Sequence, residues 1–135
     1  MSDYYLVDFE QKGDERGHLV VAESGSTIPF DIKRIFYIYG STENVVRGKH
    51  ANRNSKFLFI NLSGSCKIKV DNGKGKIDVF NLDKPHIGLY LSNMLWKEMY
   101  EFSEDSVLLV LSNNYYDENE YIRNYDDFLN EVQDI

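Results

Sequence analysis

Cysteine, proline and tryptophan are scarce in this 135-residue chain, which has one cysteine, two prolines and one tryptophan. A single cysteine forms no disulfide within its own chain, so the sequence does not require an oxidising compartment. No hydrophobic run approaches the roughly 20 residues of a membrane-spanning helix. The N-terminal stretch MSDYYLVDFEQKGDERG has neither the basic nor the apolar region of a secretory signal. We therefore expect a cytoplasmic protein without membrane contact.

Aromatic and other hydrophobic residues are plentiful. Hydrophobic residues make up 42% of the chain, and ten tyrosines and eight phenylalanines are among them. This composition is typical of a globular protein and excludes a disordered or low-complexity chain. Because the length suits one hydrophobic core and no linker-like stretch interrupts it, we expect a single domain over residues 1–135.

Charge is distributed unevenly, although the net charge is −7. Residues 117–135 contain seven acidic residues and one basic residue, while residues 33–56 carry six basic residues against Glu43. A nucleic-acid-binding domain usually has a broader basic face, so we expect no nucleic-acid partner. A compact basic patch suits a small anion such as phosphate or pyrophosphate. On charge alone, a solvated strand surface is the simpler interpretation.

Short segments of alternating or apolar residues recur every 8–12 residues, which indicates an antiparallel sandwich or barrel. Asp71-Asn72-Gly73 is a strong turn signal and predicts a hairpin between its flanking strands. The expected strands cover residues 5–9, 18–22, 33–39, 45–52, 56–62, 65–70, 76–80, 87–91, 95–100 and 106–112.

The pattern changes to helical spacing after Asp117. Tyr121, Tyr125, Phe128 and Val132 recur at intervals of three or four residues. Asp117 is placed to cap the first turn, and Glu120 lies three residues later, as in a capping box. We expect one or two short C-terminal helices packed on the outside of the barrel.

His50 has the most suggestive surroundings of the three histidines, within RGKHAN. On a regular strand His50 and Asn52 share one face, while Arg47, Lys49 and Arg53 lie on the other unless a bulge intervenes. The region is similar in shape to the first motif of cupin barrels, with His50 at the first metal-ligand position. Asn52 stands at the second, and three of the four usual ligands are missing. Because a divalent metal needs three or four such ligands, we expect no metal.

Several longer stretches carry a specific resemblance. They are IPFDIKRIFYIYG, RGKHAN, LSGSCKIKVDNG and GLYLSNMLWKEMYEFSEDSVLLVLSNNYYDENEYIRNYDDF. Together they cover about residues 7–128. The chain resembles the nucleotide-sugar 3,4-ketoisomerases, which are metal-free cupins acting on dTDP-4-keto-6-deoxy-D-glucose. The resemblance implies an all-β double-stranded β-helix (a cupin or jelly-roll barrel) with short C-terminal helices, no cofactor, and a homodimer that makes 3-amino-3,6-dideoxy sugars for surface polysaccharides.

The expected chemistry moves the ketone from C4 to C3 through an enediol. A histidine suits this task because it both accepts and returns a proton near neutral pH. The resemblance implies that His50 is catalytic, and we add Tyr37 as a possible second group. The implied substrate-binding residues are Arg16, Arg34, Arg47, Asn52 and Lys97.

One departure from the family affects the mechanism. Better-known members have His-Ala-His-Lys where this chain has His50-Ala51-Asn52-Arg53. An amide is no base near pH 7, so Asn52 can only orient or hydrogen-bond. Three alternatives follow: His50 works alone, Tyr37 or a water completes the relay, or the product or reaction has changed. Lys97 replaces the family's His or Arg, which leaves the C4 configuration of the product open.

Two other functions are compatible with the same residues. A 3,5-epimerase would act on the same dTDP-linked keto-deoxysugar, but it needs a base and an acid on opposite faces of the ring. A non-catalytic nucleotide-sugar-binding cupin would also explain the missing second histidine, because a fold does not guarantee its usual activity.

Overall fold

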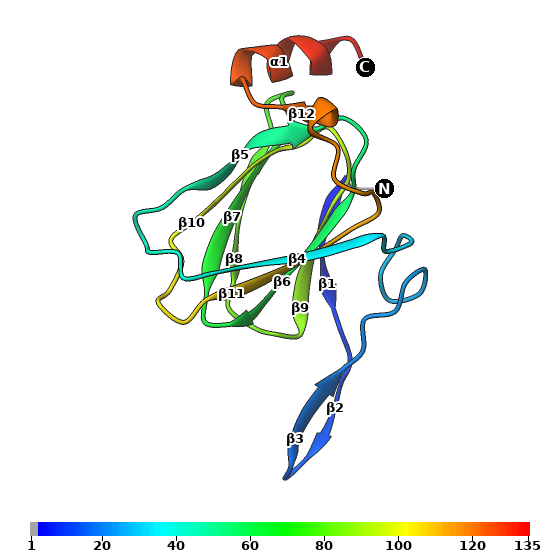
Figure 1. Ribbon diagram of the computed structural model, residues 1–135, viewed down its shortest axis with the longest axis vertical. Helices are drawn as coiled ribbons and strands as arrows, with labels where there is room; N and C mark the ends of the chain where they lie inside the picture. Colours follow the sequence, from blue (N-terminus) through cyan, green and yellow to red (C-terminus); the bar gives the residue numbers. More distant parts are fainter. Residues whose placement is uncertain (1–2) are drawn as a thin grey trace.

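Two five-stranded antiparallel sheets form the body of the molecule in the computed structural model, which describes residues 3–135 (Figure 1). The first sheet has the order β1 (Tyr4–Asp8), β9 (Ile87–Leu91), β6 (Phe57–Ser63), β11 (Val107–Ser112) and β4 (Arg34–Tyr39). The second has the order β12 (Tyr121–Ile122), β5 (Arg47–Asn52), β10 (Trp96–Tyr100), β7 (Cys66–Asp71) and β8 (Ile77–Leu82). The expected all-β barrel is confirmed.

The main hydrophobic core lies between the two sheets. Alternate residues of each strand enter it, as the period of two in CKIKV predicts: Cys66, Ile68 and Val70 are fully buried. Phe57 and Phe59 contribute from the opposite sheet. The inner face of the barrel is therefore apolar over most of its length, and polar side chains on that face stand out.

Two smaller clusters cover the outer faces of the sheets. The loop before β4 places Ile28 and Phe30 against the first sheet. Helix α1 (Tyr125–Gln133) places Phe128 and Val132 against Trp96 and its neighbours on the second sheet. Since Trp96 faces outwards to α1, the next residue of β10, Lys97, faces inwards.

The turn between β7 and β8 is the hairpin that Asp71-Asn72-Gly73 predicts. Gly73 has a φ of 73°, and a Cβ atom there would lie 2.7 Å from Val132 Cγ1. A larger residue would therefore be strained in its backbone and would push the helix α1 away.

A two-stranded hairpin departs from the sequence expectation. Strands β2 (Gln11–Asp14) and β3 (Gly17–Val20) pair with each other and project from the end of the barrel opposite α1 (Figure 1). Only the second of these strands was expected, because the exposed and polar residues of β2 lack a hydrophobic pattern.

The C-terminal segment contains a 3-10 turn, η1 (Glu118–Glu120), and α1, in agreement with one or two short helices. Asp117 caps the first turn as expected, because its carboxylate accepts a hydrogen bond from the Asn119 amide. Two details of the expectation are wrong. Tyr121 lies in strand β12, and the Glu120 side chain points towards β5 instead of closing a capping box.

Within residues 3–135, no helix has the length and apolar character needed to cross a membrane.

Candidate active site

His50 lies on the inner face of β5, half-buried, with its imidazole fixed on two sides. Nδ1 lies 3.0 Å from the carbonyl oxygen of Gly48, and the ring of Tyr121 meets the imidazole edge-on at 4.8 Å between centroids. Because a carbonyl oxygen only accepts, Nδ1 carries the proton and Nε2 keeps its lone pair. Burial and the nearby charge of Lys97 lower the pKa of His50 to about 3. The imidazole of the free protein is therefore neutral, with Nε2 as its basic atom.

Lys97 is a buried cation on β10, with 2% of its surface exposed. It pairs directly with His50 across the two strands. Its ammonium donates a hydrogen bond of 2.8 Å to Asn52 Oδ1 and lies 4.8 Å from the centre of the Phe57 ring. Burial lowers the pKa of Lys97 to about 7, although the charge of Glu120 acts in the opposite direction.

Asn52 connects Lys97 to a buried carboxylate. Its amide nitrogen donates to Glu120 Oε1 at 3.0 Å, while its oxygen accepts from Lys97. Glu120 also accepts from the Ser55 hydroxyl and from the backbone amide of Asn54. The amide at position 52 is thus held in one orientation, with its oxygen towards the lysine and its nitrogen towards the carboxylate. Such a network positions the ammonium inside an otherwise apolar barrel.

Arg34 faces the same interior from the first sheet. It pairs with Ser112 on β11, which in turn pairs with Phe57, the residue that contacts Lys97. The guanidinium stacks on the rings of Phe36 and Tyr116, at 5.1 and 5.6 Å. Its Nε and Nη2 atoms are buried and have no hydrogen-bond partner among residues 3–135. Buried donors without a partner are unusual, and these two are available to an anionic or carbonyl oxygen of a ligand.

A β-bulge in β5 changes which residues share a face with His50. His50 pairs with Lys97 and Arg47 pairs with Met99, so Lys49 is the extra residue between them. Lys97 and Met99 both point into the barrel, and their partners His50 and Arg47 therefore lie on one face. The expectation for a regular strand, which placed Arg47 on the opposite face, is corrected by the bulge. Arg47 remains solvent-exposed at the end of the strand.

Tyr37 and Arg16 are not brought to His50 within this chain. Tyr37 alternates with Arg34 and Phe36 on β4, points to the outside of the barrel and is 63% exposed. Arg16 lies in the turn of the projecting β2–β3 hairpin and forms an exposed ion pair with Asp14 at 2.7 Å.

Sequence reasoning missed Glu120 and Tyr121 as parts of the site. Glu120 looked like a helix-capping residue and Tyr121 like the first residue of a helical stripe. The signal that identifies them is the irregular segment after β11, which passes from the first sheet to β12 beside β5. Only the tertiary path of the chain brings these residues to His50 and Asn52.

The donor set around His50 is not that of a metal centre. Within the part of the chain that the structure describes, no group of three His, Cys, Asp or Glu side chains is placed to hold a metal ion. Around His50 lie the Gly48 carbonyl oxygen, Lys97 and, beyond the lysine, the amide of Asn52, and this set does not supply the several imidazole, carboxylate or thiolate ligands of a metal site.

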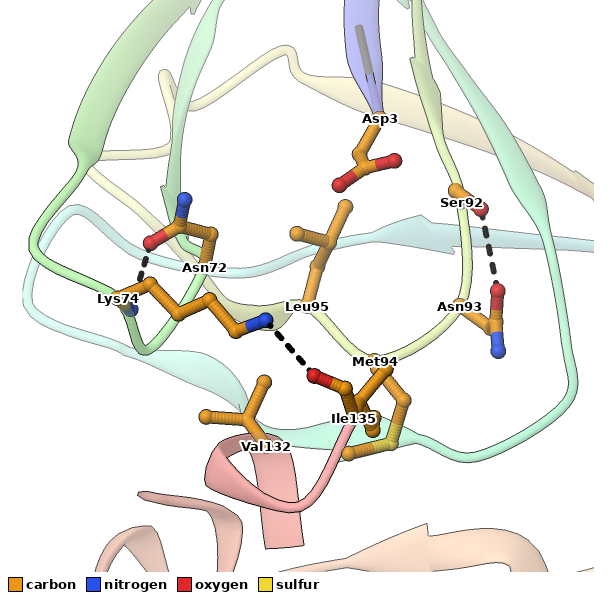
Figure 2. Close-up of a pocket in the computed structure, with 9 residues that line it drawn as sticks. All are labelled: Asp3, Asn72, Lys74, Ser92, Asn93, Met94, Leu95, Val132 and Ile135. Carbon is orange, nitrogen blue, oxygen red and sulfur yellow. Dashed lines mark hydrogen bonds between the residues drawn. The ribbon is translucent and has the colours of Figure 1, made fainter.

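A separate pocket of about 190 Å³ lies under the end of α1 (Figure 2). Lys74 reaches across it and donates to the carbonyl oxygen of Ile135 at 3.3 Å, and Leu95 and Val132 form its apolar wall. None of the residues expected to bind substrate lines this pocket.

Comparisons with known proteins identify the family of this chain. The family model described as "FdtA: WxcM-like, C-terminal" matches residues 2–133. The chain belongs to the FdtA family. A TDP-4-oxo-6-deoxy-alpha-D-glucose-3,4-oxoisomerase from Aneurinibacillus thermoaerophilus is 42% identical over 123 residues, covering 91% of this chain and 88% of the relative.

Solved structures of 3,4-ketoisomerases have nearly the same fold. WlaRA, a TDP-fucose-3,4-ketoisomerase from Campylobacter jejuni, is 44% identical with a TM-score of 0.93, covering 99% of this chain and 98% of that one. A mutant of the 3,4-ketoisomerase QdtA from Thermoanaerobacterium thermosaccharolyticum, in complex with TDP-4-keto-6-deoxyglucose, is 37% identical with a TM-score of 0.95, covering 99% and 96%. Two Streptomyces sugar epimerases, 15% and 18% identical, share the fold alone.

Proposed function

We propose that this protein is a 3,4-ketoisomerase that converts dTDP-4-keto-6-deoxy-D-glucose to a dTDP-3-keto-6-deoxyhexose. The observation that carries this function is a neutral His50 inside the barrel of an FdtA-family chain, with Nδ1 held by Gly48 and Nε2 free to act as a base. The curated relative at 42% identity is named for the same reaction, and a structural neighbour holds the same keto sugar.

In the proposed reaction His50 Nε2 removes the proton from C3 and returns a proton to C4. The intermediate is an enediol or enediolate, whose negative charge develops on the C4 oxygen. Cations next to the reacting carbons lower the energy of this intermediate. Lys97 is the buried cation in that position, since it lies opposite His50. No bound metal or organic cofactor enters the proposed steps.

Binding of the diphosphate is assigned to Arg34 and Arg47. Arg34 offers two buried donors without a protein partner, and Arg47 extends from the same face as His50. Burial is the main cause of the lowered pKa of His50 in the free protein, and repulsion by Lys97 and Arg123 adds to it. An anion bound between the two arginines acts in the opposite direction, because it favours the charged imidazolium. Substrate binding thereby makes the imidazole a stronger base. In this mechanism Tyr37 takes no part within its own chain.

A second copy of the chain is the proposed partner. Strands β1 and β4 are the two edges of the first sheet, and Ile35, Tyr37 and Tyr39 are exposed on the outer face of β4. Apolar residues at a sheet edge favour association. The hairpin that carries Arg16 extends away from its own barrel (Figure 1), which suits exchange between the copies of a homodimer. Light scattering after gel filtration measures the mass directly, and a monomer at micromolar concentration contradicts the dimer.

The proposed setting is the cytoplasmic synthesis of 3-amino-3,6-dideoxy sugars, in which a later reaction replaces the C3 ketone of the product with an amino group. Cys66 is consistent with a reducing compartment, because it is a buried free thiol whose pKa is raised to about 12 by desolvation.

Proton NMR in deuterated water tests the reaction. The purified protein is incubated with dTDP-4-keto-6-deoxyglucose, and we expect loss of the C3 proton signal together with formation of a 3-keto product. The couplings at C4 then give its galacto or gluco configuration. Exchange at C5 as well as C3 indicates a 3,5-epimerase instead. Binding of dTDP without any exchange indicates a non-catalytic sugar-nucleotide-binding protein.

A further inference from the structure

The proposed isomerisation moves two protons, and His50 accounts for only one of them. The carbon-bound proton leaves C3 and a proton arrives at C4. A second proton leaves the C3 hydroxyl, as that oxygen becomes the ketone, and a proton arrives at the C4 oxygen, as that ketone becomes a hydroxyl. The oxygen-bound proton needs a group that both donates and accepts. This inference rests on the proposed function.

Strand pairing brings one cation, Lys97, to the proposed base. It is the residue directly opposite His50, and directly opposed side chains have Cβ atoms about 4.5–5.5 Å apart. Both side chains therefore face the same small space. A sugar ring whose C3 hydrogen lies at His50 Nε2 has its C3 and C4 oxygens within reach of a neighbouring long side chain.

The surroundings of Lys97 hold its ammonium in place without neutralising it through a direct ion pair. Asn52 accepts one of its three N–H bonds, and Glu120 lies behind Asn52, so the carboxylate contacts the amide and not the lysine. Phe57 from β6 and Val70 from β7 supply apolar walls. The titratable or charged side chains described around Lys97 are His50 on the paired strand, Glu120 behind Asn52, and Arg34, which faces the same interior from the first sheet. Tyr121 lies against His50. Two N–H bonds of the ammonium remain for a ligand.

We propose that Lys97 is a catalytic residue that carries the oxygen-bound proton from the C3 oxygen to the C4 oxygen. As His50 takes the C3 proton, the electron pair of the C3–H bond forms the C3–C4 double bond. The π pair of the C4 carbonyl moves onto the C4 oxygen, which takes a proton from the ammonium. The neutral amine then takes the proton of the C3 hydroxyl. The electron pair of that O–H bond forms the C3 ketone, and the double bond takes the proton from His50 at C4. Both side chains end as they began.

This assignment explains why the site works without a second histidine. Asn52 cannot transfer a proton at neutral pH, but it fixes the lysine that does. Burial lowers the pKa of Lys97 to about 7, so at neutral pH the side chain exists both as the ammonium and as the neutral amine. A group that first donates a proton and then accepts one needs both forms. An arginine keeps its proton under all conditions of protein chemistry and supplies only charge.

The test separates the two protons by comparing Lys97→Arg with the wild type. Exchange of the C3 hydrogen with deuterated solvent reports on His50, and formation of the 3-keto product reports on the whole isomerisation. Because arginine keeps the positive charge beside the enediolate, we expect C3 exchange to persist in Lys97→Arg while product formation falls by about 100-fold or more. The matched control is Lys67→Arg on the outer face of β7, where the lysine forms an exposed ion pair with Glu101. This control should behave as the wild type.

Two further variants keep the proposal falsifiable if arginine does not fit the buried site. Lys97→Met removes the charge with little change in shape. Product formation should fall strongly, and the residual kcat should lack the pH dependence that titration of Lys97 gives to the wild type. The double variant Asn52→His/Lys97→Arg places an ionisable imidazole where Asn52 contacts the lysine, and it should recover product formation relative to Lys97→Arg. Retained dTDP binding shows that each variant is folded.

Three results would overturn the assignment. Product formation by Lys97→Arg within about threefold of the wild type would leave the lysine as a fixed charge. An equal loss of C3 exchange and product formation would make it a positioning residue for His50. An unchanged pH profile in Lys97→Met would also contradict it. If the wild type itself neither exchanges C3 nor forms product, the proposed function fails, and this outcome is distinct from all three.

Discussion

The ring of Tyr121 meets the imidazole of His50 edge-on, at 4.8 Å between centroids and an interplanar angle of 60°. Tyr121 is itself contacted by Tyr116 and by the guanidinium of Arg123, at 5.6 and 4.6 Å. The proposed base is therefore held between the Gly48 carbonyl and an aromatic residue from a distant part of the chain. This contact accounts for a single orientation of the imidazole.

Removing the Tyr121 ring should slow the reaction more than it weakens binding. In Tyr121→Ala the imidazole loses one of its two restraints, so we expect kcat to fall by about 10-fold or more, with a smaller change in KM. Tyr121→Phe keeps the ring and is the matched control, with activity near that of the wild type. Steady-state kinetics measures both variants. Equal losses in the two would mean that the hydroxyl, not the ring, is important.

Replacing the proposed base should abolish turnover but preserve ligand binding. His50→Asn removes the titratable nitrogen while keeping a group that can hydrogen-bond to Gly48, and we expect kcat to fall by about 100- to 10,000-fold. Calorimetric titration with dTDP should give an affinity close to that of the wild type. His18→Asn, on the projecting hairpin, is the control. Turnover that survives in His50→Asn contradicts the catalytic assignment.

The buried carboxylate of Glu120 should contribute to stability through the groups that donate to it. In Glu120→Gln the side chain keeps one acceptor oxygen, but its amide nitrogen faces donors from Ser55, Asn52 and the Asn54 backbone. We expect a loss of about 1–3 kcal/mol in the free energy of unfolding. Urea denaturation measures it. Glu118→Gln, two residues earlier and exposed, should change stability little; a similar loss in both variants would refute the importance of burial.

Replacing Gly48 with a residue that has a side chain should destabilise the fold, because β10 lies close to its Cβ position. Its φ is 84°, and a Cβ atom there would lie 2.9 Å from the Lys97 carbonyl oxygen and 3.0 Å from Met99 Cε. Gly48→Ala should therefore lower stability and displace the bulge that places Arg47 beside His50, which raises KM. Gly40→Ala is a matched control, since Gly40 has a φ of 74° but no atom within 4 Å of its Cβ position. The difference between the two variants isolates the steric part, which we expect to be about 1–3 kcal/mol by urea denaturation.

Acid should destabilise the fold partly through His50. Its folded pKa of about 3 lies below the ordinary value of 6.5, so between these values the unfolded chain binds more protons. Stability therefore rises as pH increases from 3 to 6.5, and the gain from this group is on the order of 4 kcal/mol at most. Comparing urea unfolding at pH 4 and pH 6.5, we expect the wild type to lose more stability on acidification than His50→Asn. The carboxylates titrate in both proteins and cancel in this comparison. Equal losses would mean that His50 is not desolvated.

Much of the barrel could be predicted from sequence because buried strands leave a local signature. The alternation in CKIKV and the turn at Gly73 depend on near neighbours, and both are confirmed. The site is harder to predict. Lys49 at the bulge looks like any strand residue, and Glu120 looks like a capping residue. What decides their positions is pairing with strands far away in sequence, and a pattern of neighbouring residues contains no information on that pairing.

The path of the chain after β11 also determines when the site can form during synthesis. Asn52 accepts a hydrogen bond from Lys97 and donates one to Glu120, which lies 68 residues later in the sequence. The side chain of Asn52 is therefore oriented only after Glu120 has been synthesised. At about 5–20 residues per second, a ribosome needs several seconds to supply that stretch. Until then the strands that carry His50 and Lys97 are synthesised without the segment that organises them, so we expect a nascent chain to gain activity only after residues 116–122 have left the exit tunnel.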